Sequence, residues 1–149
     1  MMVSCESQYN VNSRENSQPN TIYEYVFSEE SQRSVIFGPK VSHSENKTYE
    51  SLVSIERLHD GSYSVFVANK LVNDYARSYQ YTYDSLSDFR KDLDIIVDAL
   101  QNGVTTIKLN IRSNYEGDAE IGVIHHDDCD MVHLKYGSLN FIFPLSFLK

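Results

Sequence analysis

Only one segment of this 149-residue chain repeats its apolar residues with the period of an amphipathic helix. Its apolar side chains recur at steps of three and four residues, which places them in one stripe along a helix. They are Leu86, Phe89, Leu93, Ile96, Val97 and Leu100. Asp84 or Ser85 can cap the first turn, and Asn102-Gly103 is typical of a left-handed helix end. We therefore predict a single long helix near Leu86–Gln101.

On both sides of that helix, apolar and polar residues alternate with the period of a β-strand. The strands expected are 21–27, 35–37, 52–58, 63–68 and 75–83 before the helix, and 107–111, 119–126, 131–136 and 139–143 after it. Asp60-Gly61 predicts a tight hairpin, since both turn positions need positive φ. Short connections of this kind favour antiparallel pairing. The fold class predicted is α+β, with the single main helix packed on a largely antiparallel sheet.

The two ends of the chain differ in composition. Residues 1–20 are rich in Ser, Asn, Gln and Glu and have almost no apolar periodicity. Such a composition cannot bury enough apolar surface to fold, so we expect a disordered N-terminal tail. Residues 21–149 are expected to form a single α+β domain, because the length suits one domain and a 41% hydrophobic content is typical of globular proteins.

The formal net charge of −8 restricts the partners that the chain can attract. A negative surface repels nucleic-acid phosphates and anionic lipid, so neither is expected as a partner. It favours a basic protein instead. A homodimer is also possible, because exposed strand edges can pair with one another.

The expected location is the cytoplasm. No stretch approaches the ~18 apolar residues of a membrane span, and the first residues have neither the basic region nor the apolar run of a secretory signal. The two cysteines, Cys5 and Cys129, have no ligand or redox spacing. We therefore expect no structural disulfide and a reducing compartment.

The densest set of potential ligands lies between His125 and His133 and includes His126, Asp127, Asp128, Cys129 and Asp130. A metal site needs converging side chains, and neighbouring residues on a strand point to opposite faces. Asp is also a common turn residue, and no recognised zinc spacing is present. We expect a turn between two strands, with no metal and no cofactor. The alternative is a small metal-dependent enzyme built on this segment, in which His126 and His133 lie opposite each other.

Two surface features are candidates for binding a partner. The predicted helix carries Asp84, Asp88, Asp92, Asp94 and Asp98 outside its apolar stripe, which is typical either of a solvated face or of a docking surface for a basic protein. A stripe of tyrosines in 75–83 can either pack under a neighbouring element or be exposed as an interface. The candidate partner-binding residues are Asp88, Asp92, Asp98, Tyr75, Tyr79, Tyr81, Asp127, Asp128 and Asp130.

In overall build the chain resembles the immunity proteins of bacterial toxin systems, including the contact-dependent growth inhibition type. The features that carry the resemblance are the acidic helix Asp84–Asp98, the Asp127–Asp130 turn and the Tyr75–Tyr83 stripe. The resemblance implies a protein-binding inhibitor rather than an enzyme. It also implies no cofactor, and a cognate basic, nuclease-type toxin domain whose active site the protein covers. An accessory or scaffold subunit is a further alternative.

Overall fold

A computed structural model describes residues 19–44, 47–71, 77–125 and 129–149. The elements are α1 (Ile22–Val26), the 3-10 helix η1 (Glu29–Gln32), β1 (Val35–Ser44), β2 (Lys47–Arg57), β3 (Tyr63–Leu71), β4 (Arg77–Tyr83), α2 (Leu86–Asn102), β5 (Thr106–Ile107), β6 (Ala119–His125), β7 (Asp130–Tyr136), β8 (Leu139–Pro144) and α3 (Leu145–Leu148). The α+β class is therefore confirmed.

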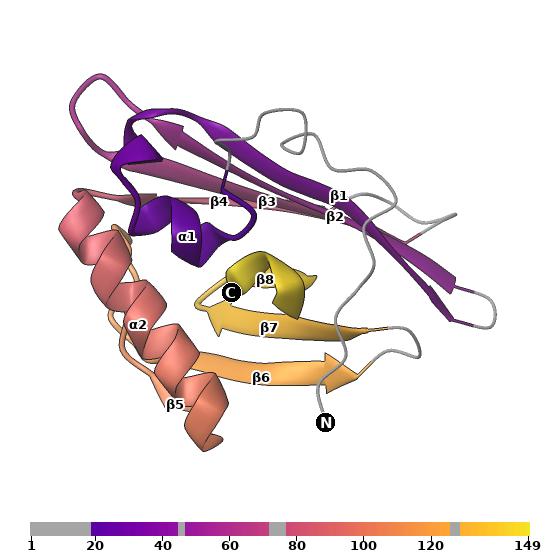
Figure 1. The fold of residues 1–149 in the computed structure, drawn as a ribbon. Helices are drawn as coiled ribbons and strands as arrows, with labels where there is room; N and C mark the ends of the chain where they lie inside the picture. Colours follow the sequence, from indigo (N-terminus) through magenta and orange to yellow (C-terminus); the bar gives the residue numbers. More distant parts are fainter. Residues whose placement is uncertain (1–18, 45–46, 72–76, 126–128) are drawn as a thin grey trace.

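The strands divide between two antiparallel four-stranded sheets instead of forming the single sheet expected. Sheet A has the order β1-β2-β3-β4, and sheet B has the order β5-β6-β7-β8. Figure 1 shows the two sheets as stacked layers, with α2 crossing one end of the stack. Strand β8 lies against β2, β3 and β4, so the two sheets face each other. The molecule is a β-sandwich closed at one end by a helix.

The core lies between the inner faces of the sheets. In sheet A the register aligns Val35, Ile55 and Val65, which are all buried. In sheet B it aligns Ile121, Leu134 and Phe141. One hydrophobic cluster includes residues from both sheets and from α2. Two sheets that each bury one face in this way explain the period-two alternation of the sequence.

Helix α2 forms as predicted. The hydroxyl of Ser85 accepts a hydrogen bond from the backbone N–H of Asp88 at 3.2 Å, which caps the first turn. Gly103 ends the helix at φ +68°, where a side chain would be strained. Phe89, Leu93 and Ile96 point into the core. Across the described residues, no helix is both long and apolar enough to cross a membrane.

The prediction of a strand over Thr21–Phe27 is wrong, because this segment forms helix α1. The side chain of Thr21 caps it by accepting from the N–H of Glu24 at 3.1 Å. The helix buries Ile22 together with Tyr25 and Val26, which follow it three and four residues later. Five residues are too few for sequence alone to separate that spacing from the alternation of a strand.

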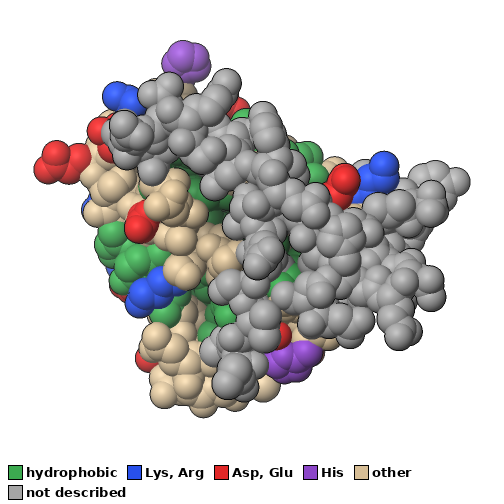
Figure 2. All heavy atoms as spheres, turned by 45° about the vertical axis from the view of Figure 1, so that its right-hand side comes forward, with side chains coloured by type: hydrophobic (Ala, Val, Ile, Leu, Met, Phe, Trp, Pro, Cys, Tyr) green, Lys and Arg blue, Asp and Glu red, His purple; other side chains and the backbone are tan. Residues whose placement is uncertain are grey.

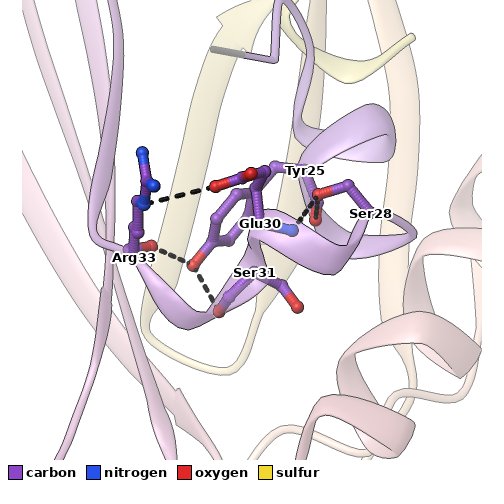
Figure 3. Close-up of polar contacts among 5 residues, drawn as sticks. All are labelled: Tyr25, Ser28, Glu30, Ser31 and Arg33. Atoms are coloured by element: carbon purple, nitrogen blue, oxygen red, sulfur yellow. Dashed lines mark hydrogen bonds and ion pairs between the residues drawn. The ribbon is translucent and has the colours of Figure 1, made fainter. Parts of the chain in front are cut away.

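The turn after α1 is fixed by two tyrosine hydroxyls, and Figure 3 shows that of Tyr25. Tyr25 donates to the carbonyl of Ser31 at 2.9 Å and also lies against the carbonyl of Arg33. Tyr63, from β3, donates to the same Ser31 carbonyl at 2.9 Å. Ser28 caps η1 by accepting from the N–H of Glu30 at 3.1 Å. Two buried hydroxyls therefore tie η1 to the core.

Other boundaries also differ from the prediction, among them the start of β2, which lies at Lys47 instead of residue 52. Strand β1 does not stop at Gly38-Pro39 but continues to Ser44, with an irregular register between Phe37 and Lys40. In the 107–111 segment, only the short β5 pairs with β6. The chain then crosses to sheet A, where the N–H of Arg112 donates to the carbonyl of Thr82 at 2.8 Å.

The expected hairpin is confirmed, since Asp60-Gly61 lies in the turn between β2 and β3 and the N–H of Leu58 donates to the carbonyl of Ser62 at 2.8 Å. Of the predicted tail, residues 1–18 lie outside the described residues.

Candidate functional site

Asp92, which was predicted to lie on the exposed acidic face, is fully buried. Its carboxylate accepts from the backbone N–H of Asn110 at 2.8 and 2.9 Å and from the Asn110 side-chain amide at 2.7 Å. The crossing segment between the two sheets is therefore pinned to α2 through one acidic side chain. The prediction of exposure is wrong because the apolar stripe on α2 is wide enough to include position 92 beside Phe89 and Leu93.

Burial raises the pKa of Asp92 above its ordinary value of 3.8, and the hydrogen bonds from Asn110 and Tyr83 offset part of that effect. Tyr83 is itself buried and stacks on Phe89 with ring centroids 4.6 Å apart. Burial raises the pKa of the Tyr83 hydroxyl far above its usual range, so it remains a hydrogen-bond donor. These contacts assign Asp92 to the core rather than to a binding surface.

The other two predicted helix acids differ from Asp92. Asp88 is half-buried in the first turn of α2, where its backbone N–H donates to the capping hydroxyl of Ser85. Asp98 is exposed near the C-terminal end, and its side chain accepts from the amide of Asn102 at 3.0 Å. Of the three, only Asp98 is exposed.

The tyrosine stripe packs under a neighbouring strand, which was one of its two predicted interpretations. Tyr79 and Tyr81 are half-buried, and their ring centroids lie 6.0 and 4.5 Å from that of Phe141 in sheet B. Burial raises the pKa of Tyr81 beyond its usual range. Tyr75 lies outside the described residues. The stripe thus forms one edge of the core, and its outer rims reach solvent.

The histidine-rich segment is divided between the two faces of sheet B. His125 Nδ1 lies 2.7 Å from Oδ1 of Asp130, which is buried, and most of the His125 side chain is exposed. His133 lies opposite Gly122 in the register, and its Nε2 is 2.9 Å from Oδ1 of Asn140. His125 and His133 therefore do not converge.

Asp127 and Asp128, as well as His126, lie outside the described residues. Within the part of the chain that is described, no group of three or more His, Cys, Asp or Glu side chains is arranged to hold a metal ion. Cys129 is fully buried and disulfide-bonded, so the expectation of no structural disulfide is wrong for this residue.

A surface that the sequence analysis missed lies where α1 packs on α2. We call it the α1–α2 surface and define it by Tyr23, Phe27, Arg90, Asp94 and Asp98. The hydroxyl of Tyr23 donates to Asp94 at 3.3 Å, and Nε of Arg90 donates to the carbonyl of Val26 at 2.8 Å. The guanidinium of Arg90 lies 5.7 Å from the ring centroid of Phe27, which is 41% exposed. Aromatic, cationic and acidic groups thus lie close together on the α1–α2 surface.

The α1–α2 surface has a depression next to its acidic residues. A shallow depression of about 450 Å³ is lined by Asp94, Ile95, Val97, Asp98 and Gln101. Burial, followed by the nearby charge of Asp94, raises the pKa of Tyr23. The ammonium of Lys149 lies 4.8 Å from the centroid of the same Tyr23 ring. The depression offers two carboxylates over aliphatic side chains, which suits a basic side chain with an apolar stem.

Part of this surface could have been found in the sequence. Arg90, Asp94 and Asp98 follow one another at four-residue steps and therefore share one face of α2. Tyr23 and Phe27 could not be added to that row, because the alternating pattern of residues 21–27 predicts a strand. On the face in Figure 2, the visible acidic side chains stand apart from one another.

Comparison with known proteins gave no relative for this arrangement. No protein-family model matches the chain, and no similar curated protein or solved structure was found.

Proposed function

We propose that this protein is an inhibitor of the toxin-immunity kind, which binds a basic, nuclease-type toxin domain and covers its active site. The observation that carries the proposal is the α1–α2 surface. There the exposed acids Asp94 and Asp98 line a depression. Asp94 also accepts from Tyr23, whose ring centroid lies 4.6 Å from that of the exposed Phe27. No cofactor is part of the proposal.

The chemistry of that surface supports a protein partner. Tyrosine and arginine are enriched among the residues that dominate binding energy in protein interfaces, and Tyr23 and Arg90 already hold fixed positions here. Side chains that are fixed before binding lose little entropy when a partner docks. The existing contacts of Tyr23 and Arg90 therefore lower the entropy cost of docking at this surface.

The charge supports a basic partner. The net charge of −8 attracts cationic proteins over a distance of about one Debye length, roughly 8 Å at physiological salt. Asp94 and Asp98 add a local attraction at the depression. A positively charged nuclease domain, whose active site has to attract phosphates, offers the complementary surface.

Growth protection tests the proposal. The proposal predicts a toxin gene beside this one, and the nuclease-type domain of that toxin is expressed in cells together with the wild-type protein or with the double variant Asp94→Lys/Asp98→Lys. We expect the wild type to restore growth and the variant to fail, since a basic partner would meet two new positive charges.

The matched control is Glu50→Lys/Glu56→Lys, which makes the same charge change at two exposed positions of β2. It should protect as well as the wild type. If both double variants protect equally, the α1–α2 surface is not the binding site. If the wild type gives no protection, or if no toxin gene lies nearby, the inhibitor proposal fails.

The proposal also places the protein in the cytoplasm, although the disulfide at Cys129 is evidence against that location, since disulfides persist mainly in oxidising compartments. Because Cys129 is buried, the test is to quench intact cells with acid and then to alkylate the thiols under denaturing conditions. A reduced, alkylated Cys129 would support a cytoplasmic location, and an oxidised one would contradict it.

A further inference from the structure

The strands at the sheet edges differ in how well they are protected against pairing. In sheet A, β1 is interrupted at Gly38-Pro39, and in sheet B, β8 ends at Pro144. Proline and irregular register are common devices that prevent an edge from pairing with another chain. Strand β4 has neither, because its register with β3 is regular from Arg77 to Tyr83. It also carries a single charged residue, Arg77.

The direction of the β4 backbone groups follows from its two neighbours. The carbonyl of Thr82 accepts from Arg112, which lies on the side away from β3. Backbone groups alternate in direction along an antiparallel strand, so those of Ser78 and Gln80 also point away from β3. Among the described residues, no strand pairs with this side of β4 between Arg77 and Tyr81. This stretch is an open template for one more strand.

The sequence of this stretch is complementary to itself. If two copies pair antiparallel about Tyr79, Ser78 lies opposite Gln80 of the second copy, and each such pair exchanges two backbone hydrogen bonds. Arg77 then lies opposite Tyr81 of the second copy, where a guanidinium can lie against an aromatic ring. No like charges face each other in this register. Aromatic pairs such as Tyr79 with Tyr79 of the second copy also stabilise a sheet.

We propose that a second copy of this chain binds at the β4 edge, so that two sheets A join into one continuous sheet across a two-fold axis. The half-exposed rims of Tyr79 and Tyr81 are then covered by the second copy. The interface is isologous, which is the usual form for a closed dimer. It leaves the α1–α2 surface out of the contact, and it does not depend on the proposed function.

Amide hydrogen exchange on the wild-type chain gives the first test. The N–H groups of Ser78 and Gln80 should be protected at high protein concentration and should exchange quickly on dilution. Those of Tyr79 and Tyr81, which point to β3, should be protected at both concentrations. Fast exchange of Ser78 and Gln80 at every concentration would overturn the proposal, even if the protein dimerises through another face.

Sedimentation gives the second test. Wild-type protein should have twice the monomer mass of 17.2 kDa and should dissociate on dilution. Ser78→Pro removes an N–H that is not used within the sheet, at a position where an edge strand tolerates proline. We expect it to raise the dimer Kd by about tenfold or more, while the control Ser78→Thr leaves it within about twofold. A monomeric wild type, or a Ser78→Pro dimer of unchanged Kd, would refute the pairing.

Discussion

Helix α2 presents acidic residues to two opposite surroundings. Asp92 is fully buried and holds the crossing segment through Asn110. Asp94 and Asp98 are exposed at the α1–α2 surface, where Asp94 accepts from Tyr23 and Asp98 borders the depression. An aspartate therefore stabilises the fold at position 92, whereas the aspartates at positions 94 and 98 of the same helix are available to a partner.

The difference shows that the number of acids on a helix does not measure its binding surface. A buried carboxylate needs hydrogen-bond donors to offset the loss of water, and its removal leaves those donors unpaired. An exposed carboxylate remains hydrated and contributes little to folding. Substitutions at matched pairs of positions should therefore separate folding effects from binding effects.

The largest effect should come from Asp92→Ala. The substitution leaves the N–H and the side-chain amide of Asn110 without an acceptor, and we expect a loss of about 3 kcal/mol in unfolding free energy. Asp92→Asn keeps one acceptor oxygen and should cost roughly half as much. Urea denaturation measures both. If Asp92→Ala were as stable as the wild type, Asp92 would not stabilise the fold.

Helix α1 offers the same comparison between two tyrosines. Tyr25→Phe removes the hydroxyl that serves the carbonyls of Ser31 and Arg33, and it should cost about 1–2 kcal/mol. Tyr23→Phe removes an exposed hydrogen bond to Asp94 and should change stability by less than about 0.5 kcal/mol. Thermal or urea unfolding compares the two variants. A larger loss for Tyr23→Phe would reverse the comparison.

The pH dependence of stability gives a smaller effect with a definite sign. Because the folded-state pKa of Asp92 is raised above 3.8, the folded protein binds this proton more tightly than the unfolded chain. The stabilisation from protonation is complete below pH 3.8 and is lost as the pH rises through the folded-state value. Relative to Asp92→Asn, the wild type should therefore gain stability as the pH falls through that window. A relative loss would contradict the raised pKa.

The smallest effect should be that of Asp94→Asn and Asp98→Asn on folding. Both side chains are exposed, so each variant should remain within about 0.5 kcal/mol of the wild type in urea. A loss of more than about 1 kcal/mol from Asp94→Asn would mean that its contact with Tyr23 serves the fold instead.

Local patterns were sufficient to predict α2, the Asp60-Gly61 hairpin and most of the strands, because each signal is contained in a short stretch. They did not predict the division into two sheets. An alternating strand buries one face in a single covered sheet and in a sandwich alike. Helix α1 was missed for a related reason, since five residues do not fix a period.

The candidate site was less predictable than the fold. The exposure of Asp98 follows from its place on α2, but the burial of Asp92 depends on Asn110, which arrives from a distant segment. The half-burial of Tyr79 and Tyr81 likewise depends on Phe141 of the other sheet. Contacts between distant segments are decided by packing, and the pattern along one strand or helix does not contain them.

The most direct test of the account is the rate at which the protein associates, at low and high salt, with the toxin domain that the proposal predicts to be encoded beside this gene. For the wild type, we expect fast association that slows as salt is added, because long-range attraction is screened. Asp94→Lys/Asp98→Lys should reduce the low-salt rate by about tenfold or more, and Glu50→Lys/Glu56→Lys should reduce it much less. Equal rates for the two double variants would contradict the claim that Asp94 and Asp98 are the acids that serve binding.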